Sequence, residues 1–208
     1  MTTHTELQLR QYGHTDAHAI REVLLDVHDE VYEGSDDPLA GRDAFAGFVD
    51  HWSAHQAFAC VIAYDKEQPV GYAYGAPLSP STTWWAKVTP PLPDAFVAET
   101  GDRTFALSEL MVRAPWRGTG AARRIHDALL SPRREQRATL LVHKDHEKVR
   151  ALYGSWGYEM VGESVPFEGA PQLCALVLPL KGSTLSIDRE AHGGPWPVRE
   201  NEDGGSRP

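Results

Sequence analysis

The chain has 208 residues, with 20 Lys and Arg against 29 Asp and Glu, and its formal net charge is −9. This length fits one domain of ordinary size. The acidic balance argues against a nucleic-acid partner, which needs clustered Lys and Arg, and it favours cationic or amine-bearing partners. Cys60 and Cys174 match no metal-ligand or disulfide spacing. No signal peptide or membrane-length apolar run is present, so we expect a cytoplasmic protein with no membrane partner.

The first half of the chain alternates between strand and helix patterns. Thr15 is suited to cap the first helix, and Asp16 places an acid in its first turn. The polar stretch 65–69 predicts the turn of a hairpin. In chain order the patterns predict a strand at 6–10, a helix over 17–31, a helix over 44–52 and strands at 58–64 and 70–74.

The second half repeats a strand–helix order, which is typical of α/β domains. Residues 76–103 contain five prolines and no clear periodicity, so we expect a long irregular loop there. We expect a single domain over 1–181 and a disordered tail over 182–208. The remaining predicted elements are a strand at 104–113, a helix over 118–130, a strand at 138–142, a helix over 147–156 and strands at 158–162 and 173–180.

The segment from Ala106 to Arg124 carries the most specific chemical pattern. A strand ends near Arg113, and a glycine-rich turn then opens a helix, whose free first-turn N–H groups can face an anion. The alternative is a glycine-rich turn without a ligand. The segment does not match a Walker A loop, because no Lys-Ser or Lys-Thr follows the glycines. It does not match a dinucleotide-binding fingerprint either, because Arg123 stands where the third small residue is needed. The predicted phosphate cradle comprises Arg117, Gly118, Thr119, Gly120, Ala121 and Ala122.

The cradle resembles the Arg/Gln-x-x-Gly-x-Gly/Ala signature of the GNAT acyltransferase superfamily. A second segment follows the apolar strand Leu140–Val142. There, His146-Glu-Lys-Val-Arg-Ala-Leu-Tyr-Gly-Ser-Trp-Gly-Tyr158 is similar to the family pattern Asn-x-x-Ala-x-x-Leu-Tyr-x-x-x-Gly-Phe. His146 and Val149 replace the usual Asn and Ala, which affects the helix cap and its hydrogen bond to the cofactor. The resemblance covers about residues 6–180.

This resemblance implies an α/β fold with a mixed, largely antiparallel sheet of about six to seven strands flanked by helices. Two splayed parallel strands, ending at Val112 and Val142, would hold acetyl-CoA or another acyl-CoA between them. The pyrophosphate would lie on the amides of Gly118 to Ala122, and the pantetheine arm on the backbone of Met111, Val112 and Arg113. The N–H near Val112 would also stabilise the oxyanion. No metal is expected.

Two residues are candidates for proton transfer in acyl transfer to an amine. On strict alternation Glu109 shares a face with Phe105, Leu107 and Met111, and apolar neighbours would raise its pKa toward that of a useful base. Its alternative roles are a structural ion pair or a contact to the substrate cation. Tyr153 aligns with the general acid of the family, and its alternative role is packing on the sheet.

The acceptor side is less defined by the sequence. Asp29 and Tyr32 belong to an acidic end of the first helix that would suit a cationic acceptor or would simply face solvent. Trp84 and Trp85 would form a wall or lid, or pack the long loop on the core. The leading hypothesis is an N-acetyltransferase acting on a small-molecule or peptide amine, and the alternative is a non-catalytic acyl-CoA-binding module. The last strands or the tail could also form a homodimer interface.

Overall fold

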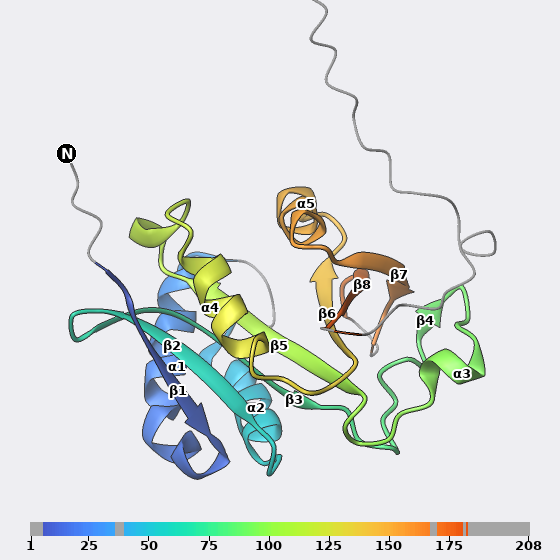
Figure 1. Ribbon diagram of the computed structural model, residues 1–208. Helices are drawn as coiled ribbons and strands as arrows, with labels where there is room; N and C mark the ends of the chain where they lie inside the picture. The colour runs from blue at the N-terminus through green and yellow to red at the C-terminus, as the bar shows by residue number, and fades with distance from the viewer. Residues whose placement is uncertain (1–5, 36–39, 167–169, 181, 183–208) are drawn as a thin grey trace, which may run out of the picture.

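One eight-stranded sheet organises the computed structural model, which describes residues 6–35, 40–166, 170–180 and 182 (Figure 1). The strand order is β1-β2-β3-β5-β6-β8-β7-β4, and every neighbouring pair is antiparallel except β5 with β6. The strands are β1 (Gln8–Gly13), β2 (Ala59–Asp65), β3 (Gln68–Pro77), β4 (Val88–Thr89), β5 (Thr104–Val112), β6 (Arg137–His143), β7 (Glu159–Ser164) and β8 (Leu173–Pro179).

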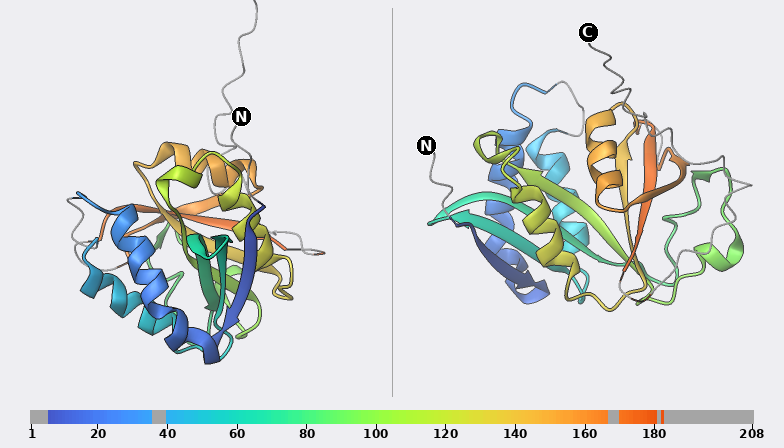
Figure 2. Two further views of the ribbon diagram at one scale, coloured as in Figure 1. Left: turned by 90° about the vertical axis from the view of Figure 1, so that its left-hand side faces the viewer. Right: turned by 45° about the horizontal axis from the view of Figure 1, so that its top comes forward.

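Helices cover both faces of this sheet. Two apolar clusters, one on each side, result from the alternation of side chains along β2, β3 and β5. Figure 2 shows α1 and α2 together on one side of the strands and α5 on the other. The helices are α1 (Ala17–Val31), α2 (Arg42–Ser53), α3 (Asp94–Val97), α4 (Ala121–Leu130) and α5 (Glu147–Ser155), with 3-10 turns η1 (His14–Asp16) and η2 (Ala114–Trp116).

The predicted α/β class and the mixed, largely antiparallel sheet are confirmed. All seven strands expected from the sequence are present, and the eighth is the two-residue β4 inside the predicted loop. The β2–β3 hairpin turns more tightly than the stretch 65–69 suggested. Asp65 pairs with Gln68, which leaves Lys66 and Glu67 in the turn, and Lys66 adopts a left-handed φ of 57°.

The helices α1 and α5 begin at the predicted residues, 17 and 147, and neither N-cap residue caps its helix with a side-chain hydrogen bond. Thr15 lies within η1, and Asp16 is the residue that precedes α1, where its carboxylate accepts a hydrogen bond from the Gly13 N–H at 2.8 Å. The residue expected to cap α1, Thr15, is therefore part of a 3-10 turn. At α5 the N-cap is His146, because its carbonyl already accepts the N–H groups of Val149 and Arg150, each at 3.0 Å.

A buried ion pair anchors the irregular segment 78–103 to the sheet. The Arg137 guanidinium lies 2.9 Å from the Glu99 carboxylate, and their side chains are 4% and 0% exposed. Glu99 also accepts hydrogen bonds from Trp85 Nε1 at 2.9 Å and Thr104 Oγ1 at 2.7 Å. These bonds satisfy polar groups that would otherwise be costly to bury, so they hold the segment in place without a long helix or strand.

Most of the predicted tail lies outside the described residues. Within the described part of the chain, no helix is long and apolar enough to cross a membrane.

Candidate active site

The strands β5 and β6 separate partway along their length. Their parallel pairing extends only from Thr104–Arg137 to Ala106–Thr139, whereas β5 continues to Val112 and β6 to His143. Figure 1 shows the two strands diverging beyond the paired end. The edge of β5 from Leu107 onward therefore has no β6 partner. This opening is the splay that the family resemblance implied.

The backbone at the end of β5 presents polar groups toward this opening. Arg113 donates its N–H to Val70 of β3 at 2.9 Å, so the N–H and carbonyl of Val112, one residue earlier, point to the opposite edge. Arg117 Nε donates to the Val112 carbonyl at 2.9 Å. The Val112 N–H is thus directed toward the opening, as expected for an oxyanion donor, whereas the Arg113 N–H is used by the sheet.

A β-bulge changes the face on which Glu109 lies. The register shifts between Tyr74–Glu109 and Gly75–Leu107, which leaves Ser108 as an extra residue in β5. Leu107 packs with the cluster beside α4, whereas Met111 packs with the cluster beside α1 and α2. Glu109 therefore shares a face with Met111 but not with Phe105 and Leu107. The alternation expected from the sequence is wrong here, because it assumed an unbroken period of two.

The environment of Glu109 favours the protonated acid. Glu109 is half-buried, and burial raises the pKa of its carboxyl from 4.5 to about 8. Tyr72 and Tyr74 lie on the adjoining strand, both fully buried, and the nearby Glu109 charge contributes to raising their pKa values. A carboxyl with this pKa can exchange a proton near neutral pH, as a general base requires.

Tyr153 lies on the opposite side of the sheet from Glu109. Tyr153 is buried on α5, in the cluster beside α4. Burial first, and the Glu109 charge second, raise the pKa of its hydroxyl, so the phenol stays protonated at neutral pH. Glu109 on β5 and Tyr153 on α5, the helix that follows β6, thus belong to the two strands that separate.

The predicted phosphate cradle is an exposed turn at the start of α4. Gly118 and Gly120 have φ values of 73° and 84°, a left-handed conformation that other residues rarely adopt. Gly120 is the N-cap of α4, and no heavy atom lies within 4 Å of a Cβ placed at either glycine. The first-turn N–H groups at Ala121 and Ala122 have no helical acceptor, so they are suited to an anion.

The histidine at the start of α5 has an aromatic neighbour. His146 is the N-cap of the helix, and its ring centroid lies 4.8 Å from that of His143, at the end of β6. Both residues therefore border the wide end of the opening. The described residues contain no group of three or more His, Cys, Asp or Glu that could hold a metal ion.

The acidic end of α1 is neutralised by arginines. Arg42 forms ion pairs with Asp29, Asp26 and Glu22, the last two at 3.0 and 2.7 Å. Arg113 pairs with Glu30 at 2.9 Å. Asp29 is thus held by an arginine rather than presented alone to a cationic acceptor. Tyr32 stacks on the buried His28 at 4.8 Å and packs against the cluster that contains Tyr72 and Met111, on the side of the sheet where Glu109 lies.

The two tryptophans have different environments. Trp85 is buried, its indole N–H is bonded to Glu99, and its ring packs against Phe96 at 5.4 Å. Of the two roles that the sequence left open, Trp85 packs the loop on the core and is not an acceptor wall. Trp84 is only half-buried and meets Trp52 edge-on at 6.2 Å, so it alone of the pair reaches the surface.

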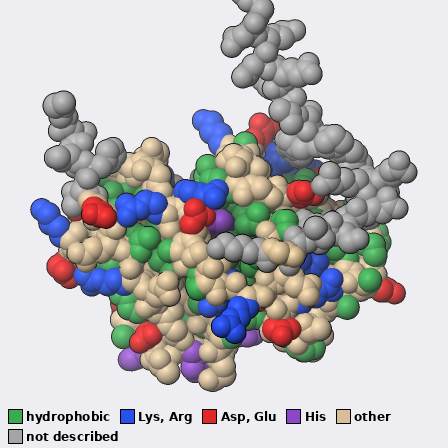
Figure 3. Space-filling model, viewed as in Figure 1, with side chains coloured by type: hydrophobic (Ala, Val, Ile, Leu, Met, Phe, Trp, Pro, Cys, Tyr) green, Lys and Arg blue, Asp and Glu red, His purple; other side chains and the backbone are tan. Residues whose placement is uncertain are grey.

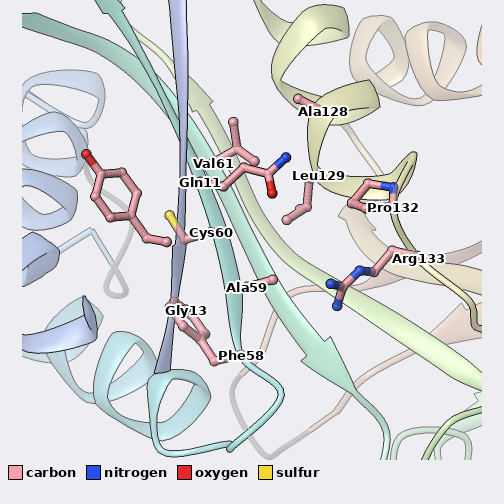
Figure 4. Close-up of a pocket in the computed structure, with 11 residues that line it drawn as sticks. Gln11, Gly13, Phe58, Ala59, Cys60, Val61, Ala128, Leu129, Pro132 and Arg133 are labelled. Atoms are coloured by element: carbon pink, nitrogen blue, oxygen red, sulfur yellow. The ribbon is translucent and has the colours of Figure 1, made fainter. Parts of the chain in front are cut away.

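A cavity of about 280 Å³ lies away from these residues, between the β1–β2 edge and the end of α4. Figure 4 shows Gln11 and Arg133 on opposite sides of this cavity, with Leu129 between them. None of its lining residues belongs to the candidate site. On the face shown in Figure 3, acidic and basic side chains are interspersed rather than gathered into blocks of one sign.

Sequence reasoning missed the aromatic residues that surround the site. Tyr72 and Tyr74 lie two positions apart in a predicted strand, so their common face could have been recognised from alternation. The buried pair His126 and Tyr158 had no such signal, because their contact joins α4 to the segment after α5.

Comparisons with known proteins agree with this geometry. Residues 95–173 match the family model of an acetyltransferase (GNAT) domain. A search of curated protein sequences finds no significant match. Solved structures with the same fold include a putative GNAT-family acetyltransferase from Desulfovibrio desulfuricans, which is 16% identical with a TM-score of 0.57 over 84% of this chain and 99% of that one.

Two further structures were solved with ligands. A putative acetyltransferase from Salmonella typhimurium with its cofactor acetyl-CoA is 15% identical, with a TM-score of 0.54 over 88% of this chain and 99% of that one. A chain of the NatC complex bound to Gag peptide and CoA is 14% identical, with a TM-score of 0.54 over 84% and 99% of the two chains. The resemblance to the GNAT superfamily is thereby confirmed.

Proposed function

Because the chain has the GNAT fold and matches a GNAT domain model, we propose that it is an N-acetyltransferase that moves an acetyl group from acetyl-CoA to a primary amine. The observation that carries this proposal is the separation of β5 from β6 after Ala106, with Glu109 on β5 and Tyr153 on α5, the helix that follows β6. We assign the activity to a single domain over 1–181.

The residues around the opening fit acetyl-CoA, which would supply an activated acetyl thioester. The left-handed turn at Gly118 and Gly120 leaves open space beside the first-turn amides of α4, where a pyrophosphate can approach. The Val112 N–H, directed toward the opening, can donate a hydrogen bond to a carbonyl oxygen that gains negative charge. Met111 and Arg113 flank this contact, and His146 borders the opening from α5.

Glu109 is the base in this proposal. A primary amine with a pKa of about 10.4 is roughly 99.9% protonated at pH 7, so a proton must leave before the nitrogen can attack. The raised pKa of Glu109, about 8, makes its carboxylate a stronger proton acceptor than an exposed glutamate. The same carboxylate would also attract the incoming ammonium, so anchoring and proton removal are successive roles of one group.

Tyr153 is the acid. The leaving CoA thiolate, with a thiol pKa of about 8.5, needs a proton, and a tyrosine with a pKa near 10 or above holds one throughout neutral pH. Burial keeps Tyr153 protonated and limits water at the reacting atoms. The proposed acceptors are small-molecule amines and peptide N-termini, the latter supported by the peptide in the NatC structure.

Thiol release from acetyl-CoA in the presence of a panel of amines tests this function. We expect release above background with at least one acceptor, and Tyr153→Phe should lower turnover by about 10²-fold without changing CoA affinity. CoA binding without release by any amine would instead indicate a non-catalytic acyl-CoA-binding module. Unchanged turnover in Tyr153→Phe would remove Tyr153 from the chemistry.

A further inference from the structure

A buried histidine joins α4 to the segment that follows α5. His126 is only 2% exposed. Its Nε2 lies 3.1 Å from the Tyr158 hydroxyl, and its Nδ1 lies 3.0 Å from the carboxylate of Asp127. Asp127 is half exposed and also accepts a hydrogen bond from Arg123 at 2.7 Å. A chain of polar contacts therefore runs from the surface of α4 to a buried tyrosine.

The partners of His126 define its protonation. An ionised carboxylate can only accept, so Nδ1 carries the proton that is donated to Asp127. Burial lowers the pKa of the imidazole, which makes the neutral ring the dominant form at pH 7, and the opposing Asp127 charge is weaker than this effect. In the neutral ring Nε2 must accept, and Tyr158 therefore donates its O–H to His126. This fixes the Tyr158 ring in one orientation.

The tyrosine held in this way contacts the proposed acid. The rings of Tyr158 and Tyr153 meet edge to face, with centroids 5.3 Å apart. Trp156 meets Tyr153 in the same manner at 5.3 Å, and the His126 ring lies 4.7 Å from Trp156. Arg123 covers the outer side of Trp156 at 5.4 Å. His126 thus contacts both aromatic residues against which Tyr153 packs.

We propose that His126 is a positioning residue, which holds the phenol of Tyr153 in place through Tyr158 and Trp156. This role rests on the proposed function of Tyr153. A buried histidine that served packing alone would need no acceptor at Nε2, and an apolar side chain of similar volume could replace it. A positioning role instead requires the hydrogen bond to Tyr158 and acts on the rate only while Tyr153 carries its hydroxyl.

Kinetics of the full chain with acetyl-CoA and an accepted amine separate these roles. His126→Leu keeps the volume but removes the acceptor, and we expect kcat to fall about tenfold with little change in KM for acetyl-CoA, since a small misplacement of a catalytic group is costly. His126→Gln is the matched control, because its amide oxygen can accept from Tyr158, and its kcat should stay near that of the wild type. In a Tyr153→Phe background, His126→Leu should cause no further loss.

Equal losses from His126→Leu in both backgrounds, or equal losses from the Leu and Gln variants, would overturn the proposal. If His126→Leu does not fold, Tyr158→Phe removes the same hydrogen bond while keeping the ring, and it should show the same loss that vanishes in the Tyr153→Phe background.

A readout without turnover keeps this inference distinct from the proposed function. In NMR spectra of protein labelled on its tyrosine rings, with signals assigned through Tyr153→Phe and Tyr158→Phe, His126→Leu should shift the Tyr153 signal and His126→Gln should not. An unchanged Tyr153 signal in His126→Leu would refute positioning even in an active enzyme. If His126→Leu shifts the Tyr153 signal but the wild-type protein acetylates no amine, the positioning of Tyr153 by His126 is supported. Only the catalytic function proposed for Tyr153 is then refuted.

Discussion

Replacing Glu109 with glutamine keeps the size of the side chain and removes its titration. Because burial raises the pKa of the wild-type carboxyl to about 8, about one-tenth of the protein carries the carboxylate at pH 7 and about nine-tenths at pH 9. If this carboxylate is the base, kcat/KM for the amine rises with pH along this titration. The amine also titrates, but equally for both proteins. The ratio of wild-type to Glu109→Gln kcat/KM should therefore rise about tenfold between pH 7 and pH 9.

The same carboxyl predicts a change in stability that needs no substrate. Glu109 has a higher pKa in the folded protein than in the unfolded chain, so its stabilising contribution is fully present below about pH 4.5 and is lost as the pH rises toward 8. Glutamine cannot ionise and shows no such loss. The difference in melting temperature, wild type minus Glu109→Gln, should fall between pH 5 and pH 8 and level off above pH 8.

The two measurements together identify what Glu109 does. Thiol release at saturating acetyl-CoA gives the kinetic ratio, and thermal melts in the same buffers give the stability difference. A flat stability difference would refute the argument that burial raises the pKa of this carboxyl. A stability difference that falls as expected, together with a flat kinetic ratio, would refute the base role and retain Glu109 as a binding group for the amine.

Three further tests, with four substitutions, address other parts of the structure. Gly120→Val should weaken CoA binding at least tenfold in titration calorimetry, because φ is 84° there and a branched side chain would hinder approach to the helix amides; an unchanged affinity would move the cradle elsewhere. Glu99→Gln should lower the free energy of unfolding in urea by about 3–5 kcal/mol, since it leaves the buried Arg137 unpaired, and a loss below 1 kcal/mol would contradict this. Gly75→Ala should lower the melting temperature, because its Cβ would lie 1.9 Å from the Ala106 carbonyl oxygen. The control Gly47→Ala, in open space on α2, should raise the melting temperature, because alanine favours a helix more than glycine does. Similar effects of the two substitutions would argue against the close contact between β3 and β5.

The sequence predicts well those features that depend on neighbouring residues. Hydrophobic alternation located β5, and the glycine-rich run placed the start of α4 within a few residues. The family resemblance supplied the splayed strands, which local patterns do not contain. Buried long-range pairs, such as Glu99 with Arg137, were not predicted, because a charged residue in a sequence gives no sign that its partner lies 38 positions away.

The different burial of the two tryptophans was also not predicted, because it depends on a partner that is distant in the sequence. Trp84 and Trp85 are adjacent and chemically alike, so composition could not assign one to the surface and the other to the core. Trp85 is the buried one because the Glu99 carboxylate accepts a hydrogen bond from its indole N–H, so this polar group keeps a partner inside the protein. Of the two tryptophans, Trp84 is therefore the one that we propose for an acceptor contact.

The bulge at Ser108 explains how groups on opposite faces of a sheet can act on one reaction. Without the extra residue, Glu109 would lie on the same face as Leu107, beside α4. With it, Glu109 lies on the face of Met111, while Tyr153 belongs to the opposite cluster. Because β6 leaves β5 after Ala106, the plane of the sheet is open there. If the proposed function is right, an amine that approaches from the side of α1 and α2 would meet Glu109, and a thioester on the side of α4 and α5 would meet Tyr153.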